Sequence, residues 1–245
     1  AEPDMHVPTG DLERLATAFE EQHGIAGVSA PLTVLRRLQP ALRKGGWQVT
    51  CALYQPTDGA APVVLDLWPG TWEGAIYGLA IDLGSTTIAA HLCDLKDGAV
   101  LASSGMMNPQ IRFGEDLMSR VSYAMMNPGG DLEMTRAVRE AIDQLTQDIA
   151  AEAGSDPTLI FESVVVCNPV MHHLFLGIDP VELGQAPFAL AQSEALTLPA
   201  RDLELTAMNA QAQVYVLPCI AGHVGADAAA VALSERPDLS EDLVL

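Results

Sequence analysis

The strongest chemical pattern in the sequence lies at a single turn. A run of strand-like residues ends at Asp82, turns at Gly84 and continues into three hydroxyl side chains, Ser85, Thr86 and Thr87. Glycine permits a sharp turn in which a Cβ would clash. Backbone amides and hydroxyls at such a turn bond phosphate oxygens, and an acid such as Asp82 can hold hydrated Mg²⁺. The pattern predicts a nucleotide phosphate loop, and the alternative is a well-formed turn that binds nothing.

Four further residues are secondary candidates for contact with a nucleotide or a partner. Asn168 follows an expected strand, where it either caps the next helix or contacts a ligand at the edge of the sheet. Asp227 stands near the start of the last helix, as a cap or as the candidate catalytic acid that orients a nucleophile or Mg²⁺-bound water. Gly222 and Gly225 precede it, and Gly225 is small enough for close helix packing.

Two other pairs have simpler explanations. Asp116 and Arg120 are four residues apart on an expected helix, which predicts an ordinary ion pair, with a functional role left open. His172 and His173 are adjacent, so on a helix they point about 100° apart and are poorly placed to share a metal ion. We therefore interpret these histidines as surface or packing residues.

Composition limits the classes of function. The chain has 245 residues, of which 49% are hydrophobic, enough for a core of one large or two smaller domains. A net charge of −20 disfavours nucleic acid and membrane surfaces as partners. No apolar run is long enough to span a membrane, and the first residues lack the pattern of a secretory signal. The four dispersed cysteines predict buried free thiols in a reducing cytoplasm.

The order of expected elements indicates an α/β chain in two parts. Residues 9–75 read as a small α+β unit after a tail at 1–8, with Pro40 expected to break or kink its second helix. Residues 76–240 read as three sequential strands, then helix, strand, helix, strand and helix. This order is typical of a ribonuclease-H-like lobe with a mixed five-stranded sheet.

Longer stretches carry a family resemblance. The turn at 82–87 resembles the first phosphate motif of the actin-like ATPase and sugar kinase superfamily. LERLATAFEEQHGIAGVSAPLTVLRRLQPALRKGGWQVTCALY followed by YGLAIDLGSTT resembles the reductive activators of corrinoid proteins. Three later stretches of the chain also resemble this family: MNPQIRFGEDLMSRV, CNPVMHHLFLGIDPVELGQAPF and LPCIAGHVGADAAAVAL.

This resemblance implies a function for the longer protein. Members use ATP, with Mg²⁺, to drive electrons onto the Co(II) form of a corrinoid protein and restore Co(I). They carry a ferredoxin-type [2Fe–2S] domain, which is absent here because no closely spaced cysteine cluster occurs. Residues 241–245 resemble the start of a second lobe that would carry the other phosphate loop. We therefore expect a chain truncated at both ends that is inactive as an ATPase alone.

The resemblance also implies partners. These are a corrinoid protein of a methyltransferase system or a methionine synthase, and a second copy in a homodimer. Two methionine pairs, Met106-Met107 and Met125-Met126, are interpreted as core filling, with an adaptable docking surface for the corrinoid partner as the alternative. Two other functions remain open: a small-molecule kinase of the same superfamily, and a docking module without catalysis.

Overall fold

The computed structural model describes residues 2, 6, 8–56 and 59–235. The chain divides into two compact units, Ala1–Gly74 and Ala75–Leu245. Each unit has its own hydrophobic core. The expected start of a second lobe at 241–245 lies outside the described residues.

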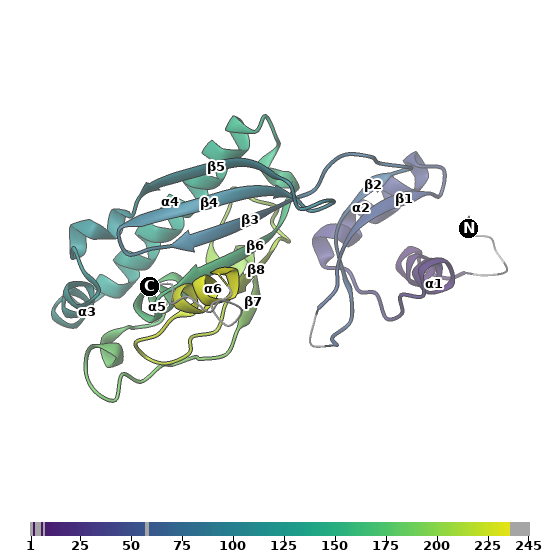
Figure 1. Ribbon diagram of the computed structural model, residues 1–245. Coiled ribbons are helices and arrows are strands. Elements are labelled where there is room, and N and C mark those ends of the chain that lie inside the picture. Colours follow the sequence, from purple (N-terminus) through teal and green to yellow (C-terminus); the bar gives the residue numbers. More distant parts are fainter. Residues whose placement is uncertain (1, 3–5, 7, 57–58, 236–245) are drawn as a thin grey trace. The chain divides into compact units, whose positions relative to one another are not determined.

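The first unit is a two-stranded antiparallel sheet with two helices (Figure 1). Its elements are α1 (Asp11–His23), α2 (Leu32–Lys44), β1 (Val49–Tyr54) and β2 (Val63–Pro69). α1 ends at Gly24, whose φ of 69° is the left-handed conformation that glycine adopts without a steric penalty. α2 packs on β2 through its buried face of Val34, Leu38, Ala41 and Leu42.

The break expected at Pro40 does not occur, because α2 continues through it to Lys44. Proline removes one helical hydrogen bond and leaves the carbonyl four residues earlier, that of Arg36, without its partner. Pro40 and Arg36 are both exposed, so water can bond this carbonyl. The buried face beside Pro40 keeps the helix in place.

The second unit is an α/β lobe built on one mixed sheet. Its strands are β3 (Tyr77–Leu83), β4 (Thr87–Asp94), β5 (Val100–Met107), β6 (Ile160–Cys167), β7 (Leu196–Pro199) and β8 (Gln213–Val216). Its α-helices are α3 (Leu117–Met126), α4 (Gly130–Glu152), α5 (Pro169–Leu176) and α6 (Ala226–Glu235). Short 3₁₀ segments are η1 (Pro109–Phe113), η2 (Pro157–Leu159), η3 (Val181–Gly184) and η4 (Ala200–Leu203).

The sheet has the strand order β5-β4-β3-β6-β8-β7, with β3, β6 and β8 parallel and the other pairs antiparallel. The expected five strands are therefore present, and the sequence interpretation missed a sixth, β7. This strand has four residues, ends in a proline and lies at the edge of the sheet. It is held by pairing with β8, so its own sequence carries little strand signal.

Helices lie on both faces of this sheet (Figure 1). α4 packs against β4 and β5, and α6 packs against β6 on the opposite face. Alternate residues of β6, including Val165 and Cys167, are buried in the core on the α4 side. The parallel strands β3, β6 and β8 end at the same edge of the sheet, and Gly225, just before α6, lies against the end of β6. None of the helices in the described part of the chain combines the length and apolar composition that a membrane-spanning helix needs.

Candidate functional site

The turn between β3 and β4 is the tight hairpin that the sequence predicts. A Cβ placed on Gly84 would lie 2.5 Å from the carbonyl oxygen of Thr87, so only glycine fits without a shift of the backbone. Thr86 and Thr87 are exposed, and Ser85 is half-buried. The hydroxyl residues are therefore carried on a compact turn that remains accessible to a ligand.

Three successive carbonyl groups of this hairpin accept hydrogen bonds from residues of neighbouring elements. Asn108 donates twice, from its side-chain Nδ2 to Gly84 O (2.9 Å) and from its backbone amide to Thr86 O (2.8 Å). Arg120 donates from Nη2 to Ser85 O (2.5 Å). Asn108 and Arg120 are both fully buried, so these donors hold the hairpin from the protein side.

This arrangement sets the direction of the hairpin amides. In a trans peptide the N–H of one residue points opposite to the C=O of the preceding residue, and the described peptides here are trans. Because the Gly84 and Ser85 carbonyls point toward buried donors, the amides of Ser85 and Thr86 point away from them. Neither amide donates a hydrogen bond to another described residue. Two amides therefore face outward as free donors suited to an anion.

Two carboxylates meet beside this hairpin at the ends of the parallel strands. Asp82 is exposed near the end of β3, and Asp227 is half-buried in the first turn of α6. Partial burial raises the pKa of Asp82, and repulsion from Asp227 raises it further. Both acids also raise the pKa of Cys167, after the larger effect of burial. Negative charge is therefore concentrated here, which favours a cation such as Mg²⁺.

Gly225 and Asn168 lie against the same strand ends. A Cβ on Gly225 would lie 2.4 Å from Cys167 O and 2.5 Å from the Cα of Asn168, so a glycine lets α6 begin close to β6. The side chain of Asn168 caps α5 by accepting from the Met171 amide (3.0 Å). Asp227 bonds the amide of Ala228, the next residue.

Gly222 lies elsewhere: a Cβ there would meet the backbone of Phe188. The structure thus brings Asp82, Asn168, Gly225 and Asp227 to one corner, and no contact joins Gly222 to the 84–87 hairpin among the described residues.

The predicted ion pair between Asp116 and Arg120 is wrong. Asp116 is the N-cap of α3, and its carboxylate accepts from Ser119 N (2.7 Å) in a capping box. This role keeps the Asp116 side chain exposed, whereas Arg120, one turn further along, points into the protein. Among the described residues no ion pair joins the two.

The sequence interpretation also missed Asn108 and Gln110, which are fully buried and polar. Asn108 bonds the hairpin, and Gln110 Oε1 lies 3.3 Å from Arg120 Nη1. The signal available in the sequence was Asn-Pro directly after β5, a combination typical of a cap at the start of a helical turn.

The adjacent histidines of α5 are buried packing residues, as one part of the sequence interpretation expected. The Nε2 atom of His173 accepts from Ala191 N, and its Nδ1 lies 3.0 Å from Pro169 O. Neither ring nitrogen of His172 has a hydrogen-bond partner among the described residues. Within the described ranges, no three His, Cys, Asp or Glu residues are grouped to hold a metal ion. The four cysteines are free thiols, and burial raises the pKa of Cys219 to about 11.

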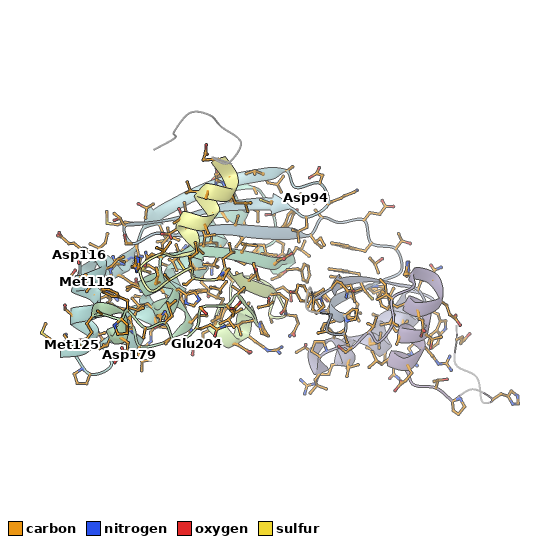
Figure 2. All side chains as sticks on the ribbon, turned by 60° about the horizontal axis from the view of Figure 1, so that its bottom comes forward. Asp94, Asp116, Met118, Met125, Asp179 and Glu204 are labelled. Atoms are coloured by element: carbon orange, nitrogen blue, oxygen red, sulfur yellow. The ribbon has the colours of Figure 1, made fainter. Side chains whose placement is uncertain are left out.

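The methionine pairs are mostly exposed, so core filling is the wrong interpretation for three of their four members. Met107, Met125 and Met126 expose 71%, 64% and 72% of their surface, whereas Met106 packs partly against the core. Met118 of α3 is also exposed, at 48%. Figure 2 shows Met118 and Met125 on α3, at the end of the second unit away from Asp94.

Comparison with known proteins identifies the family. The family model described as RACo middle region matches residues 77–238, and the one described as RACo linker region matches residues 1–74. The chain belongs to the RACo family. The resemblance to reductive activators of corrinoid proteins is thereby confirmed.

Two relatives agree with this assignment. A corrinoid activation enzyme, RamQ from Eubacterium limosum, is 35% identical over 173 residues, which are 71% of this chain and 29% of that protein. A solved structure of a reductive activator for a corrinoid, iron–sulfur protein matches 99% of this chain with a TM-score of 0.87 and 31% identity. The chain covers 38% of that structure. The match fits an actin-like, ribonuclease-H-like lobe preceded by a small α+β unit.

Proposed function

We propose that this RACo chain is the part of an ATP-dependent reductive activator that supplies its first phosphate loop. The full protein would return a corrinoid partner, in a methyltransferase system or a methionine synthase, from Co(II) to Co(I). The observation that supports this role is the hairpin at 84–87, in which two amides face outward beside a pair of carboxylates. The family and the names of the two relatives support the corrinoid part of the proposal.

Each residue has a defined part in this proposal. The amides of Ser85 and Thr86 and the hydroxyls of Thr86 and Thr87 would bond phosphate oxygens. Asp82 would hold Mg²⁺ through water. Asp227 would help to neutralise the charge of Mg²⁺ or would orient a water molecule. Magnesium is commonly bound by one or two carboxylates together with phosphate oxygens. Mg²⁺ would supply the positive charge that neutralises the phosphates in a chain with few cations.

ATP suits the reaction because reduction of a corrinoid to Co(I) is uphill from common electron donors. A ligand can shift a conformational equilibrium only by its difference in affinity between the states. If the lobe changes conformation, a nucleotide bound to it would have different affinities for the two states and would shift the equilibrium between them. The electrons would come from a [2Fe–2S] domain of the longer protein.

Calorimetric titration of Mg-ATP tests this function. We would titrate this chain, the longest native chain that contains it, and two variants, Asp82→Asn and Asp94→Asn. Asp94 ends β4 at the opposite end from the hairpin and is the matched control. We expect Asp82→Asn to weaken Mg-ATP binding about tenfold or more, and Asp94→Asn to leave it within about twofold. An equal loss in both variants, or no binding by either wild-type chain, would contradict the proposal.

A docking role without nucleotide is the second candidate, and the exposed methionines of α3 favour it. Methionine is flexible and polarizable, which suits an adaptable protein surface. Binding of a Co(II) corrinoid protein to this chain in the absence of nucleotide, lost in the double variant Met125→Ser, Met126→Ser, would support this role. Retention of binding in that variant would exclude these two methionines as the docking surface.

A further inference from the structure

Arg120 is a fully buried cation without a carboxylate partner among the described ion pairs. Its guanidinium is surrounded by neutral acceptors instead. Nε donates to Gly114 O (3.0 Å), Nη1 lies against Gln110 Oε1 and Met171 Sδ, and Nη2 donates to Ser85 O. Asp116 attracts this charge without forming an ion pair, and every described hydrogen-bond acceptor of the guanidinium is neutral. A buried charge without a paired carboxylate is expensive, so such a residue is expected to have a specific task.

The contacts of Arg120 and Asn108 converge on the hairpin. Arg120 reaches it from α3, and Asn108 from the end of β5, where its Oδ1 also accepts from the Gln110 amide (2.9 Å). Met171 of α5 lies against both donors, 3.1 Å from Arg120 Nη1 and 4.0 Å from Asn108 Nδ2. The hairpin is therefore held by donors from two segments, α3 and the end of β5, and Met171 of α5 packs against both donors.

We propose that Arg120, together with Asn108, is a positioning residue that orients the Ser85 and Thr86 amides for an anion, in practice the phosphate of a nucleotide. This inference deepens the phosphate-loop function proposed above and rests on it. Arg120 does not touch the phosphate; it acts through the carbonyl of Ser85.

Two physical effects support this role. Rotation of a peptide plane moves its N–H and C=O together, so a donor that fixes the Ser85 carbonyl also fixes the Thr86 amide. The guanidinium also places a positive charge behind the hairpin, where few charges oppose it and screening by water is weak. An anion at the front of the hairpin would therefore be attracted by the oriented amides and by the buried charge.

Lysine cannot replace arginine here. The guanidinium donates in three directions from one rigid plane, toward Gly114, toward Gln110 and Met171, and toward Ser85. An ammonium group keeps the charge but is a compact point with a flexible stem. Arg120→Lys therefore keeps the positive charge and removes the rigid set of donors that fixes the hairpin. The effect of geometry can then be measured apart from the effect of charge.

A two-part experiment tests the proposal on the whole chain. The first part records the amide ¹H–¹⁵N signals of Ser85 and Thr86 without ligand, and the second titrates Mg-ATP. The variants are Arg120→Lys and a matched control, Arg139→Lys. Arg139 is also largely buried in this unit, but it donates to Phe175 O (3.0 Å) and contacts Glu204 instead of the hairpin.

We expect Arg120→Lys to shift both amide signals and to weaken Mg-ATP binding about 10- to 100-fold, since a hydrogen bond to a charged group contributes about that much to affinity. Arg139→Lys should lower the melting temperature without either effect. Unchanged amide signals in Arg120→Lys, or equal loss of affinity in the control, would overturn the positioning role. If Arg120→Lys shifts the amide signals but the wild type binds no Mg-ATP, the role of Arg120 in fixing the hairpin would be supported and the nucleotide function would be refuted.

A second variant keeps the test decisive if Arg120→Lys does not fold. Asn108→Ser retains a hydroxyl to cap η1 but is too short to donate to the Gly84 carbonyl. It should shift the same two amide signals and weaken Mg-ATP in the same direction. Amide signals and affinity equal to those of the wild type would refute the proposal.

Discussion

The buried histidine His172 should make the stability of the second unit depend on pH. Its ring is fully buried, and in the part of the chain that the structure describes neither ring nitrogen has a hydrogen-bond partner. Burial, with a smaller contribution from His173, lowers the pKa of His172 from its ordinary 6.5 to about 4. A charged imidazolium at this site would be buried without a partner, so the folded protein resists protonation.

The sign and size of the effect follow from proton linkage. Between the two pKa values the unfolded chain binds the proton and the folded chain does not, so folding becomes less favourable as the pH falls below 6.5. One pKa unit corresponds to about 1.4 kcal/mol. Between about pH 7 and about pH 5, His172 alone should therefore remove up to about 2 kcal/mol of the free energy of unfolding.

Urea unfolding at these two pH values checks the prediction. The wild type is compared with His172→Met, which fills the site with an apolar side chain, and with His91→Gln, which changes an exposed histidine of the same unit. The wild type and His91→Gln should lose stability on acidification, and His172→Met should lose about 2 kcal/mol less. The pKa of His173 is also lowered by burial, so part of the loss should remain. An equal loss in all three proteins would refute the assignment of this pH dependence to His172.

Three further substitutions test the hairpin and the corner beside it. Gly84→Ala should destabilise the second unit by about 1–3 kcal/mol in denaturant unfolding, because its Cβ would lie 2.5 Å from a backbone oxygen; a neutral result would mean that the turn relaxes. Gly225→Ala should cost a similar amount, about 1–3 kcal/mol, since it forces α6 away from the end of β6. Asp227→Asn should lower the pKa of Asp82 in a carboxyl NMR titration and leave it above its ordinary value, because burial is the larger cause; an unchanged pKa would show that the two acids do not interact.

Local sequence predicted the features of this fold that local chemistry controls. The tight hairpin at Gly84 and the order of helices and strands around it follow from turn residues and hydrophobic periodicity. β7 was missed because its pairing with β8 outweighs its own weak pattern. Pro40 was given too much weight because the buried side of α2 compensates for one lost hydrogen bond. Both differences come from tertiary packing, which a local pattern does not contain.

Spacing along a helix identifies which residues are neighbours only when both belong to the regular helix. Asp116 and Arg120 have the spacing of an ion pair, but Asp116 is the N-cap, with an extended backbone, and its carboxylate bonds Ser119. Arg120 is then directed to a buried set of acceptors that come from residues far away in the sequence. The sequence named the arginine as a candidate but contained no signal for these acceptors.

The charge of the chain gives the buried arginine its significance. With 12 Lys and Arg against 32 Asp and Glu, the chain has few cations with which to attract phosphate. An exposed lysine or arginine beside Asp82 and Asp227 would pair with these acids instead of binding an anion. Arg120 avoids this competition because it lies behind the hairpin and its nearest partners are neutral carbonyls and sulfur. The front of the turn then combines free amides with two acids, an arrangement that favours an anion only when it arrives together with a cation such as Mg²⁺.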